Sequence, residues 1–346
     1  MSTKAELRPL DMYIMLDQSG SMADPVAGGT TKWKAVTSAL KSFIADPGSA
    51  GLGVGIGYFG VPPGGSTSCN TTCQTAADCG GPGCGPCDHI GGMGICIGAS
   101  SASDSCQAAD YAVPDVEIAE LPGTSNAQVD ALDASFMAHH PTTGTPTAPA
   151  LQGAIQHATS WQVANPTHVA VVLLATDGEP EECSPTSPAQ IGQLAAAAFM
   201  GNPSIATFVI GVGNVNALNT IAQDGGTGQA FIVNTQQDVT MQFLAALAQI
   251  RGAALGCTYV IPQPTDGSTL DPSKVNVQYT PGGSTTPETI PEVSDILHCP
   301  ASGDAWYYDD PAMPTEIVMC ANTCTTLSAD TTGEVDIVLG CASIVH

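Results

Sequence analysis

Basic residues are scarce in this chain. Its 346 residues include 7 Lys and Arg against 32 Asp and Glu, for a formal net charge of −25. No Lys or Arg occurs between Lys41 and Arg251. A chain this acidic would be repelled by nucleic acid and by anionic membrane surfaces. Aromatic residues make up only 5% of the chain, but 43% is hydrophobic, which excludes a disordered polyelectrolyte and favours a globular protein.

Long apolar runs are also missing. VAVVLLA at 169–175, which no other apolar run exceeds in length, is far too short to span a bilayer. The N-terminal stretch MSTKAELRPLDMY has no apolar signal core. We therefore expect no membrane span and, if the protein is exported, a trimmed mature form.

Cysteine, by contrast, is abundant. Seven cysteines lie within 69–106, one lies at 183 and five lie within 257–341. Two such clusters are typical of disulfide-stapled, loop-rich elements, so we expect an extracellular, cell-surface or periplasmic location. Because the count of thirteen is odd, at least one thiol is free or pairs outside the chain. The disulfide candidates are Cys69, Cys73, Cys79, Cys84, Cys87, Cys96, Cys106, Cys183, Cys257, Cys299, Cys320, Cys324 and Cys341.

Apolar periodicity predicts an α/β fold. The expected strands are 11–16, 51–60, 115–121, 168–180, 205–213 and 229–234. The expected helices are 30–45, 125–139, 147–162, 187–200, 216–226 and 238–254. This alternation indicates a doubly wound, mostly parallel central sheet with helices on both faces.

Two segments depart from that alternation. Residues 61–112 are rich in Gly, Pro and Cys and have almost no periodicity. From Cys257 onward, short β-like runs separated by Pro, Gly and Asp predict a small antiparallel β module. We therefore expect an α/β domain at 9–254, with 61–112 as a disulfide-stapled insertion between its second and third strands, and a disulfide-stabilised β module at 255–346.

Three polar motifs follow the ends of predicted elements. LDQSGSMAD places Asp17, Ser19 and Ser21 at and after the end of the first strand, and TDG places Asp177 where the strand within 168–180 ends. Between them, TTGTPTAPAL places Thr145 on a loop that opens a helix. In open α/β sheets, ligands bind beyond the carboxyl ends of the strands, so these side chains are expected to converge. Hard oxygen donors of this kind suit Mg²⁺ or Ca²⁺.

The order of these three motifs closely resembles the von Willebrand factor A domain and its metal-ion-dependent adhesion site, over roughly residues 9–250. The resemblance implies that one divalent cation, Mg²⁺ first and Ca²⁺ or Mn²⁺ as alternatives, is coordinated by Asp17, Ser19, Ser21, Thr145 and Asp177. Thr147 is the alternative to Thr145. It also implies a non-enzymatic adhesion module, in which a protein partner donates a carboxylate to the open position of the ion.

The segment DGEPEE complicates this expectation. It places Glu179, Glu181 and Glu182 beside Asp177, where they favour cation capture and oppose an anionic partner. A partner with one acidic group among basic ones would resolve the conflict. The alternative is that these glutamates form a solvated loop.

The seven-cysteine segment admits three interpretations. A disulfide-stapled loop is favoured because the segment has too few apolar residues for a core of its own. A zinc site with Cys84, Cys87 and His89 lacks a second close pair. CGPC at 84–87 matches a thioredoxin-type redox motif but lacks the expected strand and helix around it. Pairing of Cys183 with an insertion cysteine would tie the insertion near the binding face, and Cys257 with Cys341 would close the β module.

The chain lacks Gly-x-Ser-x-Gly, His-Glu-x-x-His and phosphate-loop motifs, so no enzyme activity is expected. His139 and His140 either line the site or end a helix, and Asp309 and Asp310 form either a second cation site or a polar turn. LDPSKVNVQYTPGG and WYYDDP resemble the tail of A-domain proteins predicted to lie on the surface of myxobacteria.

Two other functions remain open beside adhesion. In one, the protein is an assembly scaffold whose metal is structural, and the Cys-rich insertion or the β module makes the contacts. In the other, it is an accessory subunit of a metal-handling enzyme, as some A domains are. The cysteine pattern argues against this second, cytosolic role.

Overall fold

A computed structural model describes residues 2–4, 8–61, 72–75, 78, 87–90, 93–96, 104–121, 126–255, 258–262, 270–300, 302–330, 333–340 and 343–344. The chain divides into two compact units. The α/β unit comprises Asp11–Pro166 and Ala170–Leu247. The β unit comprises Met1–Leu10, Thr167–Val169 and Ala248–His346.

A six-stranded sheet forms the centre of the α/β unit within the described residues, in the order β10-β9-β8-β2-β3-β7. Its strands are β2 (Leu10–Asp17), β3 (Gly53–Phe59), β7 (Val116–Glu120), β8 (Val169–Thr176), β9 (Ala206–Val212) and β10 (Phe231–Val233). Strands β2 and β3, β8 and β9, and β9 and β10 pair in parallel, whereas β7 pairs antiparallel with β3. The mostly parallel sheet predicted from the sequence is therefore confirmed. Its strand order reverses between β2 and β8, as in doubly wound folds.

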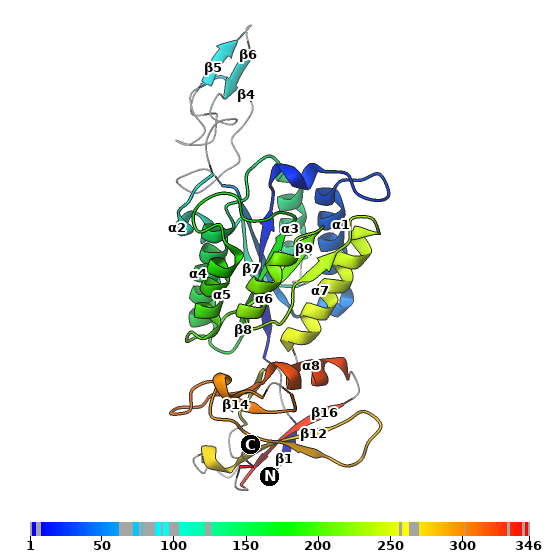
Figure 1. Ribbon diagram of the computed structural model, residues 1–346, viewed down its shortest axis with the longest axis vertical. Helices are drawn as coiled ribbons and strands as arrows, with labels where there is room; N and C mark the ends of the chain where they lie inside the picture. Colours follow the sequence, from blue (N-terminus) through cyan, green and yellow to red (C-terminus); the bar gives the residue numbers. More distant parts are fainter. Residues whose placement is uncertain are drawn as a thin grey trace. The chain divides into compact units, whose positions relative to one another are not determined.

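Helices cover both faces of this sheet (Figure 1). They are α1 (Lys32–Ala45), α3 (Ala127–Ala138), α4 (Thr147–Ala164), α5 (Pro188–Phe199), α6 (Asn219–Asp224) and α7 (Val239–Leu255). On one face, Leu151 of α4 and Ile191 of α5 pack in a core with Val172 of β8 and Val209 of β9. On the other, α1 buries Trp33, Val36, Leu40 and Phe43, which recur at helical spacing. The helix predicted at 125–139 begins at Ala127, after Asn126 in the left-handed conformation.

The glycines of β3 allow a close approach by β7. A Cβ built at Gly55 would lie 2.8 Å from the backbone nitrogen of Ile118, closer than real Cβ atoms approach. Any side chain at Gly55 would therefore push the edge strand away. This explains why a fully buried strand alternates glycine with larger residues.

The segment at 61–112 has regular structure that its composition does not predict. Its described parts include β4 (Thr72–Cys73), β5 (Cys87–Ile90) and β6 (Met93–Cys96), which form a small antiparallel sheet with the order β4-β6-β5. A disulfide joins Cys73 to Cys87. Since Cys87 is oxidised with Cys73, it is neither a zinc ligand nor the partner of Cys84 in a redox pair, and both of those interpretations are wrong for this structure. Cys84 itself lies outside the described residues.

The end of that segment packs on the α/β core. Helix α2 (Ala108–Tyr111) buries Tyr111 against α4, where a Cβ at Gly153 would lie 2.5 Å from the Cβ of Tyr111. No helix was predicted between residues 61 and 112. The short helix was missed because a single turn carries no periodic signal.

The β unit contains the antiparallel sheets predicted for the C-terminal part. One sheet has the order β1-β16-β12-β13, with β1 (Ser2–Lys4), β12 (Val275–Thr280), β13 (Glu288–Ile290) and β16 (Glu334–Leu339). The other has the order β11-β15-β14, with β11 (Thr258–Val260), β14 (Trp306–Tyr308) and β15 (Glu316–Met319). Trp306, Ile317 and Ile337 lie in their shared core.

Two elements of the β unit were not predicted, and the pairing of its expected disulfides was left open. Strand β1 pairs antiparallel with β16, with Ser2 opposite Val338. Helix α8 (Ala321–Ala329) follows β15. A disulfide joins Cys299 to Cys320, and Cys324 is also disulfide-bonded. The suggested Cys257–Cys341 pair lies outside the described residues.

Candidate metal centre

The predicted site residues lie at the reversal point of the sheet. Asp17 is the last residue of β2, and Asp177 directly follows β8. Ser19 and Ser21 lie in the turn that leaves β2. Thr145 lies two residues before α4, on a loop joined to that turn by a hydrogen bond of 2.9 Å from the Gly20 amide to the Thr143 carbonyl. Doubly wound sheets bind their ligands at this point.

Asp17 is fully buried, and hydrogen bonds fix its carboxylate. Oδ1 accepts from the Ser19 amide at 2.6 Å, and Oδ2 accepts from the Thr176 hydroxyl at 2.5 Å. Burial raises the pKa of Asp17 to about 6, and the nearby charge of Asp177 adds to that increase, against the lowering effect of the hydrogen bonds. The ionised carboxylate is therefore costly in this position, and a nearby cation would stabilise it.

The carboxylate of Asp177 accepts hydrogen bonds from both serines. Its Oδ1 accepts from the Ser21 hydroxyl at 2.7 Å and from the Ser19 hydroxyl at 3.4 Å, and the two hydroxyl oxygens are 3.0 Å apart. The Asp177 side chain has no exposed area. Four of the five predicted residues thus form one hydrogen-bonded cluster of oxygen donors.

Lys32 is a member of this cluster that the sequence analysis missed. Its Nζ lies 2.7 Å from Oδ2 of Asp177 and 3.2 Å from Oδ2 of Asp24. Burial acts to lower the pKa of Lys32, but hydrogen bonds and charge from Asp177 and Asp24 prevail and raise it. The sequence contains one signal for the position of Lys32. Thr31 is a typical N-cap residue, so Lys32 could be expected as the first residue of α1.

The threonine loop lies against the same turn. Thr145 is buried, and a Cβ built at Gly178 would lie 3.6 Å from its Oγ1. The Thr147 hydroxyl contacts the Thr145 carbonyl at 3.4 Å. A side chain at Gly60, which has a φ of 86°, would collide with the hydroxyl of Thr143. Gly60 therefore permits the close approach that positions this loop.

The acidic loop after Asp177 is partly tied down. Glu179, Glu181 and Glu182 are exposed, as a solvated loop would be. However, Glu182 also hydrogen-bonds to the carboxyl group of Asp104, whose other contact is the Gly144 amide at 2.6 Å. The next residue, Cys183, forms a disulfide with Cys106. This is the pairing of Cys183 with an insertion cysteine that the sequence suggested.

We predict that Asp104→Asn flattens the pH dependence of stability between pH 4 and 6. Burial, with a smaller contribution from Glu182, raises the pKa of Asp104 to about 6. The protonated carboxyl therefore stabilises the folded protein below its ordinary pKa, and this contribution is lost as pH rises through about 6. Asparagine mimics the protonated form. The variant should be about 1 kcal/mol more stable than the wild type at pH 7.5. This value is smaller than the free energy that corresponds to the whole pKa shift, because the Asp104 side chain is partly exposed to solvent.

Urea unfolding in chelator at pH 4.5 and 7.5 checks this prediction. Asp130→Asn is the matched control, because it neutralises an exposed carboxylate in α3. If Asp104→Asn and Asp130→Asn show the same change with pH, Asp104 is not the titrating group.

The donor chemistry of the cluster fits a hard divalent cation. Two carboxylates and two serine hydroxyls converge, with a threonine nearby, and all are oxygen ligands. Over the described ranges, no group of three or more His, Cys, Asp or Glu side chains could hold a metal. An ion here would therefore depend on neutral hydroxyls as well as on Asp17 and Asp177.

His139 and the second acidic pair have structural contacts. His139 stacks on Tyr58 with ring centroids 3.7 Å apart, and its Nδ1 lies 3.0 Å from the Ser135 carbonyl, which favours the helix-end interpretation. Asp309 accepts from the Glu316 amide at 2.9 Å, and Asp310 accepts from the Ala312 amide at 2.8 Å, as in a polar turn.

An exposed Ser–His–Asp contact occurs in the β unit. Ser294 and Asp295 both approach Nδ1 of His298, at 2.9 and 2.8 Å. A catalytic triad uses the two ring nitrogens for different partners. This contact therefore lacks the geometry of a proton relay.

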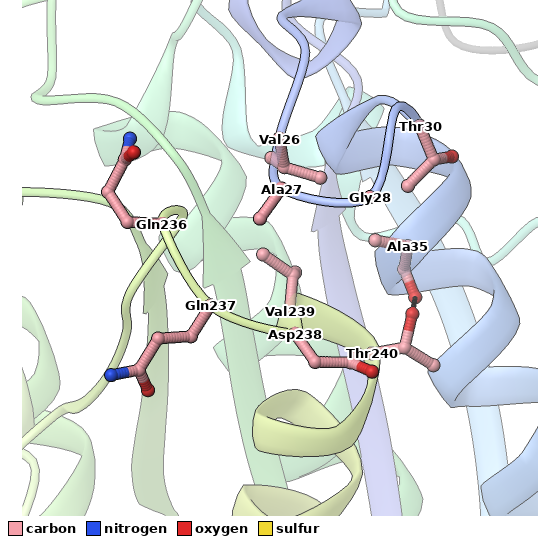
Figure 2. Close-up of a pocket in the computed structure, with 10 residues that line it drawn as sticks. All are labelled: Val26, Ala27, Gly28, Thr30, Ala35, Gln236, Gln237, Asp238, Val239 and Thr240. Atoms are coloured by element: carbon pink, nitrogen blue, oxygen red, sulfur yellow. Dashed lines mark hydrogen bonds between the residues drawn. The ribbon is translucent and has the colours of Figure 1, made fainter.

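A cavity of about 440 Å³ lies between the loop before α1 and the start of α7 (Figure 2). Its lining includes Val26, Ala27, Gln236 and Asp238. None of the five predicted metal-site residues lines this cavity. Figure 2 shows the contact between Thr240 and the Ala35 carbonyl, 3.3 Å long, at its edge. No described helix is long and apolar enough to cross a membrane.

No family model and no curated protein matches this chain. Solved structures resemble it at low identity. A von Willebrand factor type A structure from Catenulispora acidiphila is 13% identical with a TM-score of 0.45, covering 99% of this chain and 61% of that one. The pilus adhesin SpaC from Lactobacillus rhamnosus GG is 14% identical with a TM-score of 0.43, covering 97% of this chain and 39% of that one. The tip pilin GBS104 from Group B Streptococcus agalactiae is 10% identical with a TM-score of 0.39, covering 98% and 81%. This chain thus spans about three fifths of the Catenulispora protein and about two fifths of SpaC.

Proposed function

We propose that this protein is a non-enzymatic, extracellular or cell-surface module that binds a protein partner through a divalent cation, Mg²⁺ in the first place. One observation carries the proposal. Two buried carboxylates, Asp17 and Asp177, meet two serine hydroxyls where the strand order of the sheet reverses. Burying ionised groups is costly, and this cost supports a binding role for the donor set.

The proposed ligands are Asp17, Ser19, Ser21, Thr145 and Asp177, some of them through water. Hydrogen bonds from the Ser19 amide and from Thr176 orient Asp17, so its carboxylate needs little rearrangement. A bound ion would supply a positively charged, open coordination position to an acidic group of the partner. The exposed glutamates after Asp177 would select a partner whose acidic group is surrounded by basic residues.

We predict that Asp17→Ala lowers divalent-cation affinity at least 100-fold, because it removes one of two carboxylate ligands. Calorimetric titration of Mg²⁺, Ca²⁺ and Mn²⁺ into chelator-stripped protein measures this. Asp130→Ala serves as control, since it removes an exposed carboxylate and changes the net charge equally. Asp17→Asn, which preserves the side-chain shape, guards against misfolding. Equal affinity of wild type, Asp17→Ala and Asp130→Ala would show that the cluster is not a metal site.

A scaffold with a structural metal is the second candidate. It is favoured by the small sheet stapled by the Cys73–Cys87 disulfide, because this sheet contains none of the five proposed ligands. Chelation separates the two functions. Partner binding that vanishes in chelator and returns with Mg²⁺ supports the adhesion module, whereas binding that persists supports the scaffold.

A further inference from the structure

We propose that Lys32 is an internal counter-ion that holds the cation position at Asp177, so that a divalent ion binds only by displacing the lysine ammonium group. This inference rests on the proposed cation site and deepens it. It assigns to Lys32 a role opposite to that of the five proposed ligands, because the ligands would hold the ion and Lys32 would compete with it.

The contacts of Asp177 carry the inference. Its Oδ1 accepts from the serine hydroxyls of Ser19 and Ser21, which themselves are proposed ligands. Its Oδ2 accepts from Nζ of Lys32 at 2.7 Å. Both oxygens of this buried carboxylate are therefore engaged, and the second one is engaged by a full positive charge.

An ammonium group in this position opposes a divalent ion. A metal on Asp177 would lie within a few ångströms of Nζ, where two positive charges repel strongly in surroundings that contain little water. The Lys32 side chain is only 13% exposed, so solvent screens this repulsion weakly. Entry of the ion therefore requires Nζ to move away.

The structure provides a place for the displaced ammonium group. Asp24 already lies 3.2 Å from Nζ, and its side chain is 60% exposed. The lysine can therefore keep one carboxylate partner while it leaves the other. The backbone is held independently, because the Lys32 amide donates to the Asp24 carbonyl at 3.0 Å and Thr31 caps the helix. Exchange of the two cations thus needs a side-chain movement only.

Lys32→Met tests this inference, with Lys34→Met as matched control. Lys34 lies on the same helix, is exposed and carries the same charge, so its replacement measures the general effect of losing one positive charge. Calorimetric titration of Mn²⁺ and Mg²⁺ should give at least tenfold tighter binding to Lys32→Met than to Lys34→Met. If the two variants bind the ion with equal affinity and the wild type also binds it, the role of Lys32 is overturned and the cation site stands. If wild type and Lys32→Met both fail to bind any divalent ion, the cation site and the inference fail together.

A second readout uses the wild-type protein. Amine acetylation followed by mass spectrometry compares the labelling rates of Lys32 and Lys34 in chelator and in saturating Mg²⁺. Release of Nζ should speed the labelling of Lys32 several-fold and leave Lys34 unchanged. An unchanged rate at Lys32, in protein shown by calorimetry to be saturated, would overturn the inference.

Discussion

The double variant Cys106→Ser/Cys183→Ser is expected to lower the free energy of unfolding of the α/β unit by about 4 kcal/mol. The disulfide closes a loop with a sequence separation of 77 residues, which restricts the unfolded chain strongly. It also anchors the acidic loop that follows Asp177. Urea unfolding with and without the substitutions measures the loss, and limited proteolysis of 178–186 reports the release of the loop.

The Cys299–Cys320 bridge provides the control for this effect. It closes a separation of only 21 residues in the β unit, so its removal should cost about 3 kcal/mol there and leave proteolysis at 178–186 unchanged. A loss below about 1 kcal/mol for Cys106→Ser/Cys183→Ser would mean that other contacts already restrain this segment in the unfolded chain.

Arg8→Ala is expected to destabilise the β unit by about 3 kcal/mol, because it leaves a partly buried carboxylate without its cation. The guanidinium group of Arg8 is almost fully buried and pairs with Glu316 of β15, and its Nε donates to the Thr167 carbonyl at 3.0 Å. Burial lowers the pKa of Arg8, while the charge of Asp309 opposes this. Hydrogen exchange of β12 and β16, followed by mass spectrometry, reports the stability of this unit directly.

A double variant without either charge separates the ion pair from simple packing. Arg8→Met/Glu316→Leu replaces both charges by apolar groups of similar size, so it should restore most of the stability lost in Arg8→Ala. If the double variant is as unstable as Arg8→Ala, the loss comes from the bond to Thr167 or from packing.

The architecture of the α/β unit could be predicted because its two central strands, β2 and β8, are mostly apolar and buried. VAVVLLAT in β8 is buried along almost its whole length, so both composition and length identify it as a central strand. The same holds for β2. Once these two strands are known, the rule on the carboxyl ends of parallel sheets brings Asp17 and Asp177 together without any coordinates.

The elements that escaped prediction have weak local signals. Strand β1 has the sequence STK, which contains no apolar residue, and only its pairing with β16 makes it a strand. Helix α8 has the sequence ANTCTTLSA, which contains three β-branched threonines that disfavour helix. In both cases, contacts with residues distant in sequence decide the local structure.

The sequence predicted the oxygen donors of the candidate site. It did not predict the charged side chains, Lys32 and Asp104, that contact the site from distant parts of the chain. Acidic neighbours of Asp177 were visible because they are adjacent in sequence. Lys32 contacts the same carboxylate across 145 positions, and Asp104 reaches the Gly144 amide across 40. Long, flexible side chains such as lysine can reach several partners, so sequence alone does not identify the one they choose.

The pairing of β1 with β16 has a consequence for biosynthesis. Ser2–Lys4 are translated long before their partner strand, Glu334–Leu339. The α/β unit is complete once Leu247 has emerged and can fold while synthesis continues. The four-stranded sheet, in contrast, cannot be completed before Glu334–Leu339 have emerged. Until then β1 stays unpaired. Its short, polar sequence has a low tendency to aggregate.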